Sequence, residues 1–125
     1  MSTFKVTFAG GAQMPTGSNF LVEFGGKKIL IDCGLVQGEK YSIPINSEPF
    51  AYDPSSIDTL FVTHAHLDHV GRIPRLVHDG FKGKILSTEP TREMAELIML
   101  DSMGVIAKES KFNNQPLLYE EKDVY

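Results

Sequence analysis

Residues 63–70 have the sequence THAHLDHV, which places three histidines and one aspartate, His64, His66, Asp68 and His69, within six consecutive positions. Neutral imidazole nitrogens and carboxylate oxygens are the donors that zinc and its neighbouring transition metals prefer, and structural zinc sites are usually closed by four such groups. This crowding of donors predicts a metal site. Two simpler interpretations remain: four solvated polar side chains in a loop, or a single structural zinc ion.

The residues before the motif predict how its donors are directed. The apolar run at 60–62 is typical of a strand buried on both faces, and it brings His64 to its C-terminal end. His64 and His66, two positions apart on an extended backbone, leave the chain on the same side. Asp68 and His69 are adjacent and point to different sides unless the backbone turns there. This divergence favours two metal ions over one.

A further carboxylate follows a second apolar run. Residues 28–31 lead directly into Asp32, Cys33 and Gly34. A charge at the end of a buried strand is costly unless it is paired, so acids in this position often belong to sites, although a turn-forming aspartate is equally compatible with it. Beside the histidine cluster, we expect Asp32 to hydrogen-bond a ligating imidazole or a metal-bound water. Cys33 is predicted to be a small buried apolar residue.

The whole pattern predicts an α/β fold with a β-rich start followed by alternating strands and helices. Gly25 and Gly26 separate two apolar runs and predict a tight hairpin. Residues 15–18 predict an ordinary turn in preference to a phosphate-binding loop, and the prolines within 38–56 predict a surface excursion. Strands are expected at 4–8, 19–24, 28–31, 59–63 and 84–87, a short helix at 74–77 and a long helix at about 91–108.

Composition narrows the class of protein. The chain has 125 residues, about one domain's length, and 42% of them are hydrophobic. It has no apolar run near the ~18 residues of a membrane span and no signal-like N-terminus, so we expect a cytoplasmic protein with no membrane contact. One cysteine excludes an internal disulfide. The net charge of -4 argues against nucleic-acid binding by a basic surface alone, but not against a nuclease whose metals supply positive charge.

Together, these motifs resemble a known family. The sequence HAHLDH at 64–69, with an upstream apolar strand ending in Asp-Cys-Gly at 32–34, resembles the metallo-β-lactamase fold of metal-dependent hydrolases. The flanking segments 16–38, 46–77 and 80–102 are similar to the beta-CASP branch, the RNA-processing nucleases related to cleavage-and-polyadenylation specificity factors and ribonuclease J. The similarity covers nearly all of the chain, apart from a departure at residues 14–15.

The resemblance implies a role for each candidate residue. His64 and His66 would bind one metal ion, and Asp68 and His69 a second, while Asp32 would be the catalytic aspartate behind them. Asp68 would act mainly as a ligand and also assist as a general base. The implied cofactors are two Zn²⁺ ions, with other divalent transition metals as substitutes, and the implied reaction is hydrolysis of RNA phosphodiesters by a hydroxide held between the two metals.

In that family, further ligands and an inserted subdomain follow beyond the position of Tyr125. We therefore expect residues 1–125 to be a partial domain, the N-terminal portion of an αββα sandwich, that is inactive alone. Its partners would be RNA and the remainder of a longer protein, or a second copy in a homo-oligomer. Two alternatives share the motif: a small-molecule hydrolase such as a thioesterase or lactonase, and a non-catalytic binding paralogue.

Overall fold

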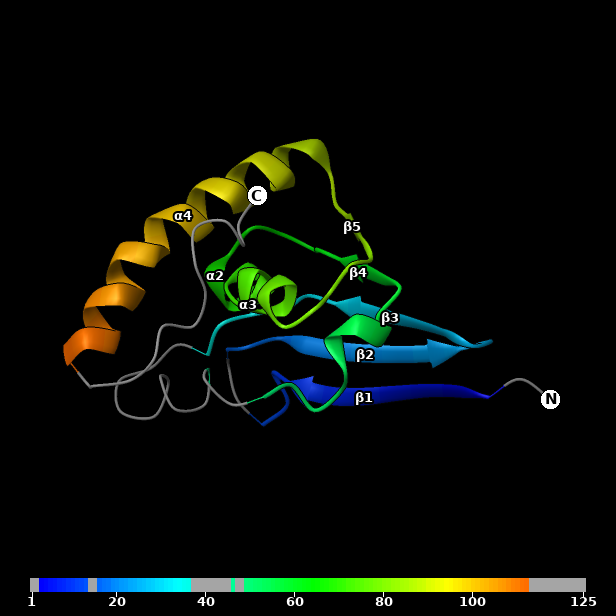
Figure 1. The fold of residues 1–125 in the computed structure, drawn as a ribbon. Coiled ribbons are helices and arrows are strands. Elements are labelled where there is room, and N and C mark those ends of the chain that lie inside the picture. Colours follow the sequence, from blue (N-terminus) through cyan, green and yellow to red (C-terminus); the bar gives the residue numbers. More distant parts are fainter. Residues whose placement is uncertain (1–2, 14–15, 37–45, 47–48, 113–125) are drawn as a thin grey trace.

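The computed structural model describes the chain except for residues 1–2, 14–15, 37–45, 47–48 and 113–125, and for 103–112 it describes the backbone alone. Five strands form one sheet in the order in which they follow along the chain (Figure 1). The first three strands are antiparallel, and β3, β4 and β5 are parallel. The strands are β1 (Phe4–Gly10), β2 (Asn19–Phe24), β3 (Lys27–Ile31), β4 (Thr59–Phe61) and β5 (Lys84–Leu86).

The hairpin between β2 and β3 turns through two residues, as the sequence predicts. Gly25 and Gly26 have φ angles of 57° and 79°. Positive φ at both central residues is characteristic of the tight turns that match the twist of paired strands, and glycine adopts it without steric cost. This turn fixes the register in which Leu21 lies opposite Leu30.

The hydrophobic core lies on one face of this sheet. Leu21, Leu30 and Leu60 occupy matching positions on β2, β3 and β4 and are buried. Helices α2 (Leu67–Val70), α3 (Ile73–His78) and α4 (Glu89–Phe112) pack on this face and contribute buried side chains. Those side chains are Val70, Ile73, Leu76, Ala95 and Met99.

The other face of the sheet is also apolar, but no described helix or strand packs on it. It includes Phe4, Phe8, Phe24, Phe61 and Leu86, whose exposed fractions range from 42% to 67%. Strand register places these residues on one face, which we call the open face. The expectation that the run at 60–62 is buried on both faces is therefore wrong for Phe61. A sheet covered by helices on one side confirms the predicted α/β class and corresponds to the N-terminal portion of a sandwich.

Helix α4 begins close to the predicted position but packs differently. The Oγ1 atom of Thr88 accepts a hydrogen bond from the N–H of Thr91 (3.4 Å), an N-terminal cap for the helix. The helical spacing of Met94, Leu97, Ile98 and Val105 predicts one apolar face for this helix, but Met94 and Leu97 are 55% and 67% exposed. The buried residues of α4 are Ala95, Met99 and Ser102, and Ile98 packs against the core, as predicted for it. None of the described helices is long and apolar enough to cross a membrane.

Candidate metal centre

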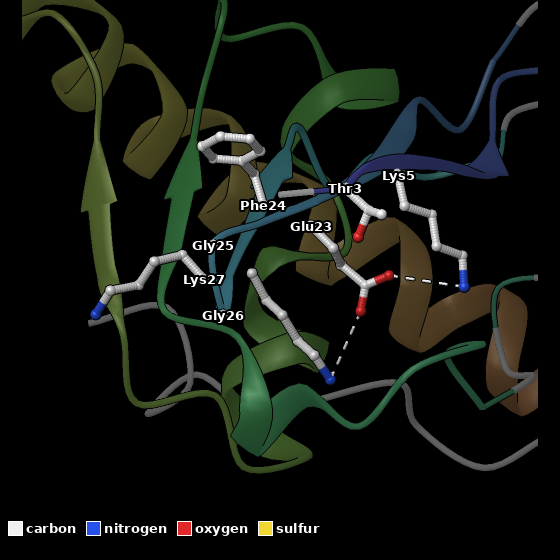
Figure 2. A pocket seen from close by; sticks show the side chains of 8 residues that line it. Thr3, Lys5, Glu23, Phe24, Gly25, Gly26 and Lys27 are labelled. Atoms are coloured by element: carbon white, nitrogen blue, oxygen red, sulfur yellow. Dashed lines mark ion pairs between the residues drawn. The ribbon is translucent and has the colours of Figure 1, made fainter. Parts of the chain in front are cut away.

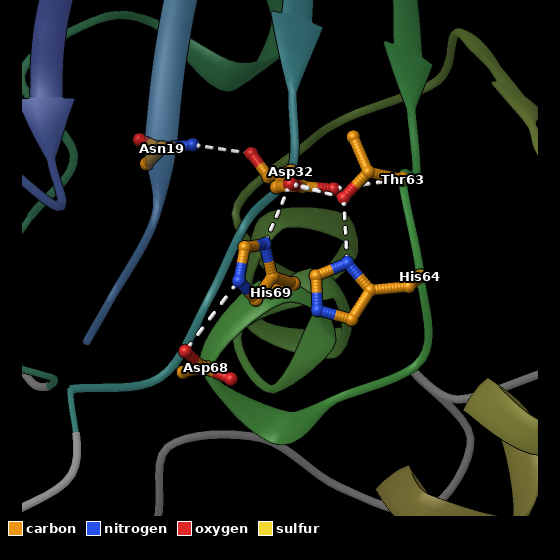
Figure 3. Close-up of polar contacts among 6 residues, drawn as sticks. All are labelled: Asn19, Asp32, Thr63, His64, Asp68 and His69. Carbon is orange, nitrogen blue, oxygen red and sulfur yellow. Dashed lines mark hydrogen bonds and ion pairs between the residues drawn. The ribbon is translucent and has the colours of Figure 1, made fainter. Parts of the chain in front are cut away.

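The predicted site residues gather where two parallel strands end (Figure 3). Strands β3 and β4 run side by side with Ile31 opposite Phe61, so Asp32 and Thr63 follow at the same edge of the sheet. In α/β sheets, ligands bind at this edge. Helix α2 starts only a few residues later and places the second half of the motif beside Asp32.

The turn on which the sequence prediction depended is the first turn of α2. His66 has an extended backbone (φ -67°, ψ 145°), and the helix begins at the next residue. The turn returns His69 toward the strand end, where the centroids of the His64 and His69 rings are 3.9 Å apart. The centroids of the His64 and His66 rings are 4.7 Å apart. The structure therefore brings all three imidazoles together, and Asp68 Oδ2 lies 3.5 Å from His69 Nε2.

Asp32 is the most constrained residue of the cluster. It is 2% exposed, and its backbone has a φ of 60°, in the left-handed region. Its carboxylate accepts hydrogen bonds from the N–H of Thr63 (2.8 Å) and from Thr63 Oγ1 (2.7 Å). The same carboxylate lies 2.7 Å from His69 Nδ1. Asp32 thus joins the loop after β3 to both halves of the histidine motif.

These contacts indicate which nitrogen of each ring carries the proton. Because a carboxylate only accepts, the Nδ1–H of His69 donates to Asp32, and in the neutral ring the lone pair is then on Nε2, on the side of Asp68. The Thr63 hydroxyl donates its one hydrogen to Asp32. Its oxygen therefore accepts a hydrogen bond from the Nδ1–H of His64, at 3.0 Å. His64 Nε2 then also carries a lone pair. A metal-ligating histidine typically has this arrangement, with its other nitrogen held by an oxygen acceptor.

The comparison with known proteins identifies the family. The family model described as "Metallo-beta-lactamase superfamily" matches residues 15–120. The chain belongs to the metallo-beta-lactamase superfamily. The resemblance inferred from HAHLDH and the Asp-Cys-Gly strand end is confirmed. Membership of this superfamily implies that the chain contributes to binding of divalent metal.

The relatives that match the chain include a ribonuclease, a transcription termination factor and a cleavage and polyadenylation factor. Ribonuclease TTHA0252 of Thermus thermophilus is 40% identical over 97 residues, which are 78% of this chain and 22% of that protein. Transcription termination factor FttA of Methanosarcina mazei is 40% identical over 112 residues, 86% of this chain and 17% of that protein. Cleavage and polyadenylation specificity factor subunit 3-I of Arabidopsis thaliana is 32% identical over 122 residues, which are 95% of this chain and 17% of that protein. The chain spans about one fifth of the length of these relatives.

The donor set fits a divalent metal in chemical type. Imidazole and carboxylate are the ligands such ions take, and two of the imidazoles already have the required hydrogen bond on Nδ1. Within the described residues, however, no three His, Cys, Asp or Glu side chains are arranged so as to enclose an ion. The three rings pack against one another instead. The ligand roles of His64, His66, Asp68 and His69 therefore stay predictions.

Cys33 has a structural role, as the sequence suggests. It is fully buried, and burial raises the pKa of its thiol to about 12, so the thiol is protonated and poorly suited to bind metal at neutral pH. Its backbone N–H donates to His69 O (2.9 Å), and its carbonyl accepts from the N–H of Arg72 (2.9 Å). These bonds fasten α2 to the loop after β3.

The loop after β3 approaches α2 so closely that only glycine fits beside Asp68. A Cβ atom on Gly34 would lie 1.6 Å from the carbonyl oxygen of Asp68. The same carbonyl accepts the N–H of Ser18 (2.9 Å), so that amide of the predicted turn serves the fold and not a phosphate. Pro15 lies outside the described residues.

The structure also separates the site from other polar features. His78 is exposed at the end of α3 and lies outside the cluster, as predicted. A shallow pocket of about 290 Å³ lies at the β2–β3 hairpin (Figure 2). The hairpin is at the opposite end of β3 from Asp32. There Glu23 pairs with Lys5 at 3.7 Å and Lys28 at 3.9 Å.

Sequence reasoning missed three polar residues that support Asp32. They are Thr63, Asn19 and Tyr52, and their hydrogen bonds link back to Asp32 directly or through one another. Asn19 gives the clearest signal, since it is a polar residue that opens an apolar strand. Its burial and its partners depend on residues far along the chain.

Proposed function

We propose that this chain supplies the first part of a site at which a larger protein hydrolyses RNA phosphodiesters with two zinc ions. His64 and His66 would hold one ion, and Asp68 and His69 the other. The remaining ligands would come from residues outside these 125. The observation that carries the proposal is the pair of hydrogen bonds that hold Nδ1 of His64 and Nδ1 of His69, together with the Asp68 carboxylate that lies 3.5 Å from His69 Nε2.

RNA is the substrate class that the relatives favour. A ribonuclease and a cleavage and polyadenylation factor both match more than three quarters of this chain. A phosphodiester is anionic, and this chain carries a formal net charge of -4, so attack on it needs local positive charge. Bound divalent ions would supply that charge and an activated water molecule at neutral pH.

The residues of the chain have separable tasks in this proposal. The Asp32 carboxylate holds the proton on His69 Nδ1 and thereby keeps Nε2 directed at the site. Thr63 does the same for His64 through its hydroxyl oxygen. Asp68, with its side chain 22% exposed, is the accessible carboxylate and can also accept a proton during the reaction.

The test uses the whole protein of which this chain is a part. His66→Ala and Asp68→Ala should each lower cleavage of an end-labelled RNA by at least about a hundredfold. Loss of a residue that only hydrogen-bonds a metal ligand lowers activity about ten- to a hundredfold, and loss of the ligand itself lowers it more. His78→Ala is the matched control, since His78 lies outside the cluster. Elemental analysis should give close to two zinc ions per chain in the parent and fewer in the first two variants.

Two results would contradict the proposal. Unchanged RNA cleavage by His66→Ala would remove the cluster from the chemistry. A parent protein that hydrolyses thioesters or lactones but leaves RNA intact would assign the site to small molecules. For the 125-residue chain alone, we expect weak zinc binding and no turnover.

A further inference from the structure

We propose that Asn19 and Tyr52 are positioning residues that hold Asp32 in the conformation its carboxylate needs to reach His69. The side-chain amide of Asn19 donates from Nδ2 to the backbone carbonyl of Asp32 at 2.9 Å, as Figure 3 shows. The hydroxyl of Tyr52 donates to Oδ1 of Asn19 at 2.8 Å. Neither residue contacts an imidazole in these bonds, so both act through Asp32.

The backbone of Asp32 needs such support. Its φ of 60° lies in a region that L-residues enter rarely and that Asn and Asp enter more readily than most. Its N–H is anchored by Phe61 O at 2.8 Å, on β4. Its carbonyl is anchored by Asn19. With both sides of the residue fixed, the carboxylate is directed at Thr63 and His69.

The carbonyl of Asp32 determines which way the Asn19 amide points, and Tyr52 completes that arrangement. If the amide were reversed, Oδ1 would face the carbonyl oxygen of Asp32, and two acceptors would oppose each other. With Nδ2 facing Asp32, the Tyr52 hydroxyl donates to Oδ1 and holds the amide in place. Tyr52 is held by stacking on Phe50, with ring centroids 5.4 Å apart and planes at 26°. The guanidinium of Arg72 lies 4.1 Å from the centroid of the Phe50 ring.

The hydrogen bond between Asn19 and Asp32 lies in the interior of the protein, not at its surface. Asn19 is 6% exposed and Asp32 2% exposed. An amide removed from water retains its hydrogen bonds strongly, because the alternative is an unpaired buried group. The segment at residues 50–52 is therefore coupled to the loop after β3, although it forms no strand of the sheet.

The experiment compares two buried asparagines in the full 125-residue chain. Asn19→Ala removes the bond to Asp32. Asn46→Ala is the matched control, because Asn46 is 3% exposed and bonds both the N–H and the carbonyl of Val36, at 2.8 and 2.9 Å. Histidine tautomers are read from side-chain ¹⁵N shifts in the metal-free chain. Zn²⁺ affinity is read by competition with a chromophoric chelator.

We expect the parent and Asn46→Ala to show His69 with its proton on Nδ1, and Asn19→Ala to show a mixture of tautomers. Zn²⁺ affinity should fall about tenfold in Asn19→Ala relative to Asn46→Ala, the low end for residues behind a ligand. A purely structural role would lower the unfolding temperature of both variants alike and leave tautomer and affinity unchanged. That result would overturn the inference.

A second variant covers the case in which Asn19→Ala does not fold. Tyr52→Phe keeps the stacked ring and removes only the hydroxyl, and it should shift the His69 tautomer in the same direction by a smaller amount. A tautomer identical to that of the parent would overturn the inference. The affinity measurement rests on the proposed function, whereas the tautomer measurement does not. A tautomer shift in a chain that binds no Zn²⁺ would therefore support the positioning role and count against the metal site.

Discussion

At the scale of single residues, Asp32 combines a strained backbone with a fully engaged side chain. Three hydrogen bonds converge on its carboxylate, and its φ is 60°. The sequence predicted an acid near the site because Asp32 ends an apolar strand. It could not predict the left-handed backbone or the ring tautomers, because these depend on Thr63 and His69, which are 31 and 37 positions away.

Replacing Asp32 should separate the backbone contribution from the side-chain contribution. Asp32→Ala and Asp32→Gly both lose the carboxylate, and each should lower the free energy of unfolding by about 2 kcal/mol or more. Asp32→Gly should be the more stable of the two by about 1 kcal/mol, since glycine adopts positive φ without the Cβ penalty. Urea denaturation measures both values. Equal stability of the two variants would show that the backbone relaxes on substitution.

Cys33 should make the fold sensitive to alkali. The pKa of its thiol is raised from its ordinary value of 9.0 to about 12 by burial. In the unfolded chain the thiol ionises near pH 9, so its contribution to stability is complete below that pH and is lost as the pH rises toward 12. Cys33→Ala should therefore show a shallower fall in the free energy of unfolding between pH 9 and the highest pH at which the parent refolds. Parallel curves for parent and variant would contradict this assignment.

At the scale of elements, the sequence predicted local structure better than it predicted how the elements pack. The Gly25-Gly26 hairpin and the start of α4 near Thr88 follow from residues adjacent in sequence. The packed face of α4 was predicted correctly for Ile98 but not for Met94 and Leu97, because the buried stripe is the one that contains Ala95 and Met99. Helical spacing alone cannot tell which stripe meets the sheet.

The contact between the β3 loop and α2 can be tested with a pair of glycines. Gly34→Ala would place Cβ on the Asp68 carbonyl, so the backbone of one element must move, at a cost of about 3 kcal/mol or more. Gly25→Ala meets no atom within 4 Å and carries only the penalty of its positive φ, about 1 kcal/mol. Chemical denaturation of the two variants should show this order. If Gly34→Ala lowered the free energy of unfolding less than Gly25→Ala does, α2 would have to shift easily.

At the scale of the whole molecule, the sheet has two apolar faces and the described helices cover one. Large contiguous apolar patches are uncommon on soluble monomers. The open face is therefore expected to bind something when the 125-residue chain is studied alone, and a second copy is the partner always available. Family resemblance predicted the layered class, but the extent of this face appears only when strand register aligns its residues.

Self-association of the isolated chain tests this expectation. Phe8 and Phe24 are 67% and 52% exposed on the open face. Replacing both by threonine keeps strand propensity while removing two large apolar side chains, and should weaken self-association at least about tenfold. Lys5→Thr, on the opposite face of β1, is the control. Sedimentation equilibrium at several concentrations gives the comparison, and equal association by all three chains would exclude the open face as the contact.

The parallel pairing of β3 with β4 also sets the order of events during folding. Asp32 and Thr63 are 31 positions apart and meet only after β3 and β4 have paired, whereas the donors at residues 64–69 are neighbours in the unfolded chain. Pairing across such a separation is slow compared with local turn formation. Zinc added before refolding should thus encounter the histidines before Asp32 and Thr63 have bonded His69 and His64, and excess metal should retard the approach to the native state.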